Sequence, residues 1–141
     1  MVKALYRFFV LLFVVTACSD DSETLLDLPL ESRNLVGTWQ LNGYKISAGG
    51  PLPDDFTNIE SATRYIFELD GSYTFIEEIG NNPLHEGTFR FIENELVLEP
   101  SEGGVDRYSF YIELSRNTMI LSPTGPIICI EGCLYRYQRV D

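Results

Sequence analysis

The chain has 141 residues, 45% of them apolar and 13% aromatic, with 21 acidic and ten basic residues and a formal net charge of −11. This length suffices for one domain with a hydrophobic core. The negative charge makes nucleic acid and anionic membranes poor partners.

The first seventeen residues have the layout of a secretory signal peptide. Lys3 and Arg7 give a positive start, residues 8–15 (FFVLLFVV) are continuously apolar, and Thr16-Ala17 is small. A membrane span needs about 20 apolar residues, so this run is too short to be one. We therefore assign residues 1–17 to a signal peptide.

The end of this segment carries a more specific motif. Val15-Thr16-Ala17-Cys18 resembles the bacterial lipobox, in which the chain is cleaved before a lipidated cysteine. The resemblance implies that Cys18 is the first residue of the mature protein and carries diacylglycerol and palmitate. Two or three acyl chains hold a protein at a membrane without spanning it. The alternative is an ordinary signal peptide followed by a chance cysteine.

The residues after Cys18 (SDDSE) favour a solvated tether, assigned to residues 18–33. An acidic run in this place also resembles the surface-export signal of some Gram-negative bacteria, and Ser19 fits the outer membrane. We therefore expect a lipid-anchored outer-membrane protein, exposed on the cell surface or facing the periplasm. Without residues 1–17 the chain keeps eight basic and 21 acidic residues, a net charge near −13.

Residues 34–141 alternate between apolar and polar positions, with turn residues between the segments, which is typical of an all-β antiparallel barrel or sandwich. Asp70-Gly71 indicates a tight hairpin turn. The longest polar connection, residues 47–61, is the expected lid of an up-and-down barrel. About eight strands are expected, at 36–44, 63–69, 72–79, 85–91, 95–99, 105–114, 118–121 and 134–140.

The first and last expected strands resemble a known family. Residues 35–39 (LVGTW) and 135–140 (YRYQRV) resemble the lipocalin-like domains of bacterial lipoproteins. In that superfamily a Gly-x-Trp packs at the closed end of a small up-and-down barrel, and a late arginine stacks on the indole. The resemblance implies this structural role for Gly37, Trp39 and Arg139. A guanidinium over an indole contributes about 0.5–2 kcal/mol.

An eight-stranded barrel either fills with side chains or holds one small ligand. In the first case the protein is an interaction module whose loops bind another envelope protein. In the second, a cavity under residues 47–61 binds a small apolar or amphipathic molecule, with phenols that orient it. The residues expected to line such a site are Tyr65, Phe67, Tyr73, Phe75, Phe89, Tyr108 and Phe110.

One acid interrupts this pattern. Glu77 falls on the apolar face of its strand, between Phe75 and Ile79. Burial of an unpaired carboxylate is very costly. Glu77 must therefore pair with a cation, lie at the barrel mouth, where it could contact a ligand, or turn outward through a bulge.

Cys129 and Cys133 are a candidate disulfide in an oxidising envelope, where Gly132 lets the chain fold back. Two free thiols are the alternative. The spacing differs from the redox Cys-x-x-Cys, and His85 is the only histidine, so a zinc site is not expected. Asp54 and Asp55, with their polar neighbours, form a solvated loop rather than a calcium site.

The sequence contains no motif of a known catalytic site, such as Gly-x-Ser-x-Gly or His-Glu-x-x-His. Adjacent acids such as Glu77 and Glu78 point to opposite faces of a strand. We therefore expect a protein that is not an enzyme and that holds no metal or cofactor.

Overall fold

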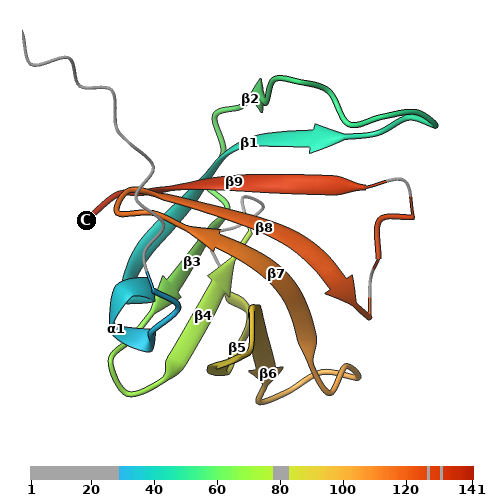
Figure 1. Ribbon diagram of the computed structural model, residues 1–141. Coiled ribbons are helices and arrows are strands. Elements are labelled where there is room, and N and C mark those ends of the chain that lie inside the picture. The colour runs from blue at the N-terminus through green and yellow to red at the C-terminus, as the bar shows by residue number, and fades with distance from the viewer. Residues whose placement is uncertain (1–28, 78–82, 127, 131) are drawn as a thin grey trace, which may run out of the picture.

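The computed structural model describes residues 29–77, 83–126, 128–130 and 132–141, apart from the side chains at 83 and 84 (Figure 1). The predicted signal peptide, Cys18 and the tether up to residue 28 lie outside the described residues, as does Ile79.

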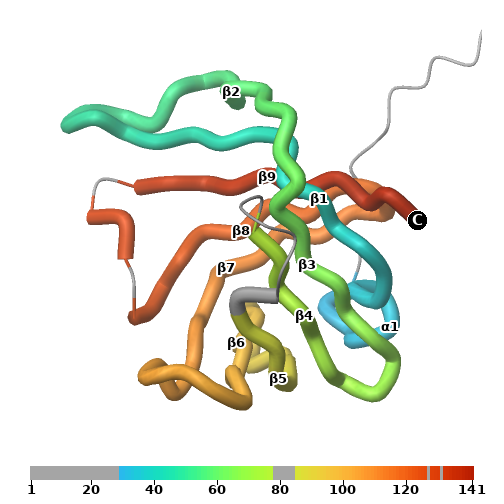
Figure 2. The backbone as a smooth tube through the Cα atoms, turned by 180° about the vertical axis from the view of Figure 1, so that it is seen from behind, coloured from blue at the N-terminus to red at the C-terminus, as the bar shows by residue number. Residues whose placement is uncertain are grey.

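The described residues form a closed antiparallel barrel. Each strand from β3 to β8 pairs with the next along the chain, and β1 pairs with both β3 and β9, which closes the sheet (Figures 1 and 2). The predicted eight-stranded up-and-down barrel is therefore confirmed. The elements are α1 (Ser32–Leu35), β1 (Gly37–Ile46), β2 (Thr57–Asn58), β3 (Arg64–Phe67), β4 (Ser72–Ile76), β5 (Pro83–Ile92), β6 (Glu95–Pro100), β7 (Tyr108–Leu114), β8 (Thr118–Gly125) and β9 (Cys133–Arg139).

The alternation of the sequence explains the barrel interior. Successive side chains of a strand point to opposite faces, so every second residue enters the core. Tyr65 and Phe67 of β3 are buried in this way, and so are Leu96 and Leu98 of β6. The remaining core residues are Leu35, Trp39, Tyr73, Phe89, Ile112, Leu114, Met119, Leu121 and Tyr137.

The turn between β3 and β4 forms at Asp70-Gly71, and Gly71 has a φ of +86° that favours glycine. One carboxylate oxygen of Asp70 accepts hydrogen bonds from the backbone N–H and hydroxyl of Ser72, at 2.9 and 2.6 Å. These two bonds lower the pKa of Asp70 below its ordinary value. The turn residues thus fix the register of the hairpin.

The barrel is closed at one end by an indole and a guanidinium. Trp39 is completely buried and donates a hydrogen bond from Nε1 to the carbonyl of Leu35, at 2.7 Å. Cζ of Arg139 lies 4.3 Å from the centroid of the Trp39 ring. The Arg139 guanidinium also donates to the carbonyls of Asn34 and Arg116, at 2.8 and 3.0 Å. It therefore ties the helix, the β7–β8 hairpin and the last strand together.

Gly37 makes room for this guanidinium. Its φ is +132°, and a Cβ atom there would lie 2.7 Å from Nη1 of Arg139. The same Nη1 donates to the carbonyl of Val36 at 2.6 Å. A side chain at residue 37 is thus disfavoured both by backbone conformation and by contact with Arg139.

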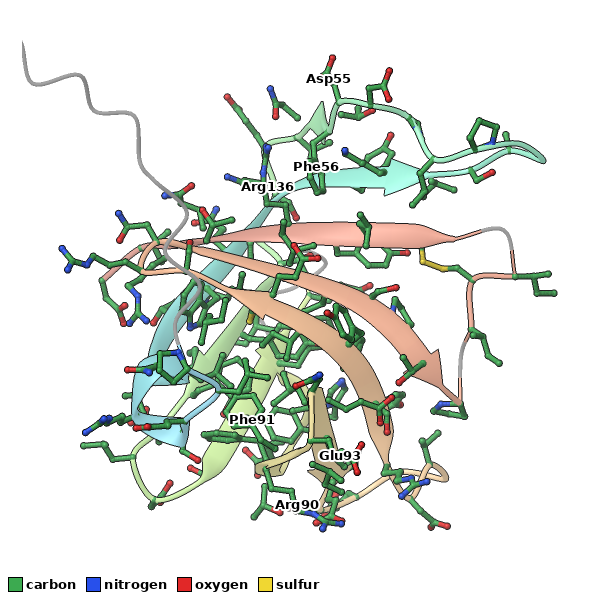
Figure 3. The ribbon with its side chains drawn as sticks, viewed as in Figure 1. Asp55, Phe56, Arg90, Phe91, Glu93 and Arg136 are labelled. Atoms are coloured by element: carbon green, nitrogen blue, oxygen red, sulfur yellow. A yellow bond between two sulfur atoms is a disulfide. The ribbon has the colours of Figure 1, made fainter. Side chains whose placement is uncertain are left out.

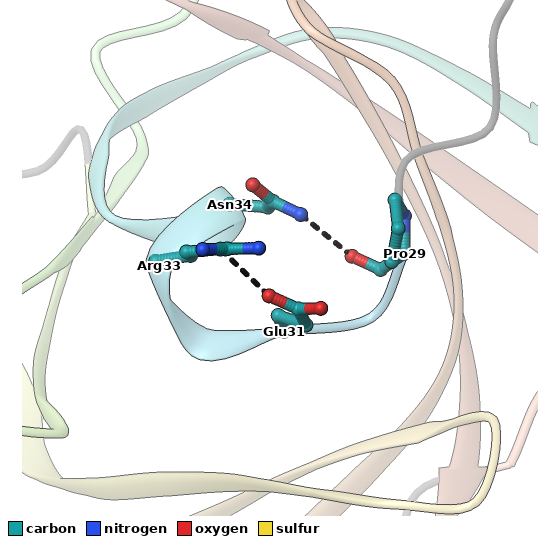
Figure 4. Close-up of polar contacts among 4 residues, drawn as sticks. All are labelled: Pro29, Glu31, Arg33 and Asn34. Atoms are coloured by element: carbon teal, nitrogen blue, oxygen red, sulfur yellow. Dashed lines mark hydrogen bonds and ion pairs between the residues drawn. The ribbon is translucent and has the colours of Figure 1, made fainter.

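Residues 29–33, which precede the predicted start of the domain at residue 34, also contact the barrel and the short helix. Leu30 packs against the core, and the side-chain amide of Asn34 donates to the carbonyl of Pro29 at 2.9 Å (Figure 4). Nε of Arg33 pairs with the carboxylate of Glu31 at 2.6 Å. These local contacts place the short helix α1 beneath the closed end. Within the described residues, no helix has the length and apolar composition needed to cross a membrane.

Glu77 does not enter the barrel. A register shift between Phe75 and Ile76 interrupts the β4–β5 pairing, β4 ends at Ile76, and Glu77 is exposed. The bulge therefore places the carboxylate in water, where it needs no partner.

Residues 47–61 form an arm along the outside of the barrel instead of a loop across its mouth. Strand β2 in this arm pairs with β1. The guanidinium of Arg136 donates to Asn58 at 2.6 Å and lies 4.7 Å from the ring centroid of Phe56 (Figure 3). Gly43 permits this crossing, because a Cβ there would lie 2.9 Å from Nη2 of Arg136.

Candidate functional site

A cavity of about 290 Å³ lies at the end of the barrel opposite Trp39. On β7 and β8 the lining residues Phe110 and Pro123 lie two positions beyond the core residues Ile112 and Leu121. The core thus fills one end of the lumen and leaves the other end open. The lining residues are Tyr65, Phe75, His85, Tyr108, Phe110, Pro123 and Gly125.

Four of the seven predicted ligand-binding residues line this cavity, namely Tyr65, Phe75, Tyr108 and Phe110. The other three, Phe67, Tyr73 and Phe89, are buried in the core. Their rings are in contact: Phe67 lies 5.0 Å from Phe89 and 6.3 Å from Tyr73, between ring centroids. They support the floor of the cavity.

His85 is the most polar side chain in the cavity wall. Its ring is stacked on Phe75 from β4, at 4.9 Å and 27°, and on Tyr108 from β7, at 5.1 Å and 24°. Its Nδ1 is 2.9 Å from the hydroxyl of Tyr73. Within the described residues Nε2 forms no hydrogen bond. The imidazole is therefore held in one orientation, and none of the described residues bonds its second nitrogen.

The cavity wall is uncharged near neutral pH. None of the seven lining residues is Asp, Glu, Lys or Arg. Burial lowers the pKa of His85 below its ordinary value, which keeps the imidazole neutral. Burial also raises the pKa of Tyr65 and of Tyr73, so both phenols stay protonated. The site therefore offers aromatic surface and neutral hydrogen-bonding groups.

His85, Pro123 and Gly125 also line the cavity, although they were not among the predicted ligand-binding residues. The expected strand ended at Leu121, and residues 122–125 (SPTG) are of types that are common in turns. In the structure β8 continues to Gly125, and it pairs with β9 only as far as Leu121. Pro123 lies beyond the residues that pair with β9, so the N–H group that proline lacks is not needed for a hydrogen bond to that strand. Met119 and Leu121 face the inside of the barrel, and the same alternation continued along the strand places Pro123 and Gly125 on the inside as well.

The expected lid is not observed. None of the described lining residues comes from residues 47–61, so the prediction that this segment covers the cavity is wrong for the part of the chain that is described. The arm is fixed elsewhere by pairing of β2 with β1 and by Arg136. Among the described residues, no group of three or more His, Cys, Asp or Glu side chains is placed to hold a metal ion.

A group of exposed aliphatic side chains, here called the apolar tip, lies beside the disulfide. Cys129 is bonded to Cys133, with 5.7 Å between their Cα atoms, and Cys133 pairs with Ile46 of β1. Leu52 lies against Gly132, where a Cβ would be 3.5 Å from its Cγ. These links join the four members of the tip, Ile46, Leu52, Ile128 and Ile130, of which Ile128 is 64% and Ile130 98% exposed.

The pKa of His85 predicts a pH-dependent stability. Tyr73, Phe75 and Tyr108 face the imidazole and none is charged, so the folded state resists its protonation. The unfolded chain takes up the proton first as the pH falls below about 6.5, and stability is lost from there downwards. We expect the urea midpoint to fall between pH 7 and pH 5, and His85→Gln to abolish this fall. An equal fall in the variant would contradict the assignment.

Known proteins share this architecture. A family model described as a lipocalin-like domain matches residues 35–121, more than half of the chain. A lipocalin-like protein from Bacteroides uniformis ATCC 8492 is 17% identical, with a TM-score of 0.54 over 76% of this chain and 99% of that one. An uncharacterized protein from Bacteroides eggerthii DSM 20697 is 16% identical, with a TM-score of 0.53 over 74% and 98% of the two chains. No curated protein matches. The family match and the closed barrel agree, and the chain belongs to the lipocalin-like domain family.

Proposed function

We propose that the protein is an outer-membrane lipoprotein that binds a small apolar or amphipathic ligand at the open end of its barrel. The observation that carries this proposal is the cavity of about 290 Å³, with aromatic walls and a neutral histidine. Ligand sites are concave and mostly apolar, with a few polar groups that orient the ligand. The volume lies just below the usual range of about 300–1,000 Å³, which suits a small molecule.

Occlusion of the cavity tests ligand binding. A Cβ at Gly125 would meet no atom within 4 Å, and its position continues the inward series of β8. Gly125→Leu is therefore expected to fill the mouth without a clash. Native mass spectrometry of the protein purified from the bacterial envelope should show a bound mass that this variant loses. Gly50→Leu, also in open space but on the outer arm, should retain it. A bound mass that survives in Gly125→Leu would place the ligand elsewhere.

Substitution of Cys18 tests the proposed lipid anchor. The lipobox resemblance of residues 15–18 supports attachment through Cys18. Cys18→Ser is expected to move the protein from the membrane pellet to the soluble fraction and to abolish incorporation of labelled palmitate. Full membrane association of this variant would contradict lipid anchoring.

The apolar tip favours a second candidate function, an interaction module that binds another envelope protein. Large exposed apolar patches on soluble proteins mark interaction sites. A photo-crosslinker at Ile130, introduced in living cells, should capture one discrete partner. The same crosslinker at Leu69, which is 80% exposed in the β3–β4 turn, is the control. Identical products at both positions would exclude a specific role for the tip.

A further inference from the structure

The arrangement around His85 restricts what a ligand can contact. Phe75 approaches the imidazole from β4 and Tyr108 approaches it from β7, both nearly parallel to it, with ring centroids 4.9 and 5.1 Å away. The faces of His85 are therefore covered, and a ligand meets its edge. Since the Tyr73 hydroxyl occupies Nδ1, the polar group left on that edge is Nε2. This nitrogen offers one hydrogen bond in the plane of the ring.

The charge of the site restricts the ligand further. No lining residue is formally charged, so a buried carboxylate or ammonium would have no partner and would pay a large desolvation cost. The net charge of −11 adds repulsion of anions. An uncharged molecule avoids both penalties.

The size and walls of the cavity indicate the shape of the ligand. A cavity of about 150 Å³ holds benzene, so about 290 Å³ admits a molecule about twice as large. Aromatic rings on the wall favour flat ligands, because ring pairs gain stacking and edge contacts beyond simple burial. Tyr65, Tyr108 and Phe110 bring such rings from two different strands, β3 and β7.

We propose, as a refinement that rests on the proposed ligand-binding function, that the cavity binds an uncharged, planar aromatic molecule of about two fused rings. Its hydrogen-bonding group contacts Nε2 of His85. Such a cavity prefers flat aromatic molecules to flexible acyl chains. Within it, His85 selects ligands that carry a polar substituent.

Four probes test the class. 2-Naphthol is the reference, and 1-decanol has the same number of non-hydrogen atoms and the same hydroxyl on a flexible chain. Naphthalene lacks the hydroxyl, and 2-naphthoate adds a negative charge. All the strands and core residues that the structure describes lie within residues 29–141, so calorimetry can use the chain from Ser19 to Asp141 without lipid. We expect 2-naphthol to bind at least tenfold more tightly than 1-decanol and 2-naphthoate, and about fivefold more tightly than naphthalene.

A double variant tests the role of His85. In Tyr73→Phe/His85→Phe the ring stack is kept and no hydroxyl is left unpartnered. The variant is expected to bind 2-naphthol only as tightly as naphthalene, while its affinity for naphthalene stays unchanged. Gly125→Leu should abolish binding of both probes, and Gly50→Leu should not.

The possible outcomes separate this proposal from the proposed function. If 1-decanol binds more tightly than 2-naphthol, the ligand is not a planar aromatic molecule. If 2-naphthoate binds more tightly than 2-naphthol, the ligand is not uncharged. In either case the proposed function, ligand binding in the cavity, would still hold. Phenyltrimethylammonium is added as a fifth, cationic probe, and its tight binding would show that the rings form a cage for a cation instead. If no probe binds and native mass spectrometry finds no bound mass, both proposals fail together.

Discussion

Trp39→Ala is expected to lower the free energy of unfolding by about 3–5 kcal/mol, as truncation of a large buried aromatic side chain usually does. The indole is completely buried, bonded to the carbonyl of Leu35 and covered by Arg139. Its removal opens a void at the closed end and leaves the guanidinium without its aromatic partner. Urea unfolding followed by far-ultraviolet circular dichroism measures the change.

A milder variant keeps this test informative if Trp39→Ala does not fold. Arg139→Lys retains the charge but loses the planar fork that reaches the carbonyls of Val36 and Asn34. A loss of about 1–2 kcal/mol is expected. Leu69→Ala, at a largely exposed residue, should change stability by less than about 0.5 kcal/mol. Equal effects in Leu69→Ala and Arg139→Lys would contradict a structural role for the closed end.

Gly87→Ala is expected to be the most damaging of the small substitutions, with a loss of at least about 2 kcal/mol. A Cβ at this position would lie 2.0 Å from the carbonyl oxygen of Glu99 and 2.8 Å from Cα of Pro100. Both atoms belong to the backbone of β6, so no side chain can move aside and the two strands must separate. Overpacking of this kind costs about 1–3 kcal/mol and sometimes more.

Hydrogen exchange shows which strands Gly87→Ala destabilises. Amide protection in β5 and β6 should fall in Gly87→Ala, while β1 and β9 keep most of theirs. Gly50→Ala is the matched control, because its Cβ meets nothing within 4 Å. Where the backbone tolerates it, this exchange of glycine for alanine is neutral or slightly stabilising. Equal stability of the two variants would contradict a steric clash at Gly87.

The barrel was predictable because apolar and polar residues alternate along most of its strands and turn residues separate them. Tyr65 and Phe67 enter the core as a period of two requires, and Asp70-Gly71 marks the turn that follows. The length of β8 was not predictable, because Pro123 and Gly125 are typical of turns and only the absence of β9 alongside them makes a strand possible.

The candidate site was predictable only in part. Aromatic residues on inward positions follow from alternation, but which of them face open space depends on depth along the barrel. Tyr73 and Phe75 differ by two positions, yet the first is buried in the core and the second lines the cavity. The outward turn of Glu77 depends on a bulge that no local pattern specifies. Depth and bulges are set by contacts between distant strands.

The closure of the barrel has a consequence for the order of folding. Arg139 and Val36, which meet at the closed end, are 103 residues apart in the sequence. The indole of Trp39 thus stays uncovered until the chain has been synthesised as far as Arg139. Such long-range closure is slow compared with local hairpin formation. The joining of β1 and β9 is therefore expected to be the last step in folding of the barrel.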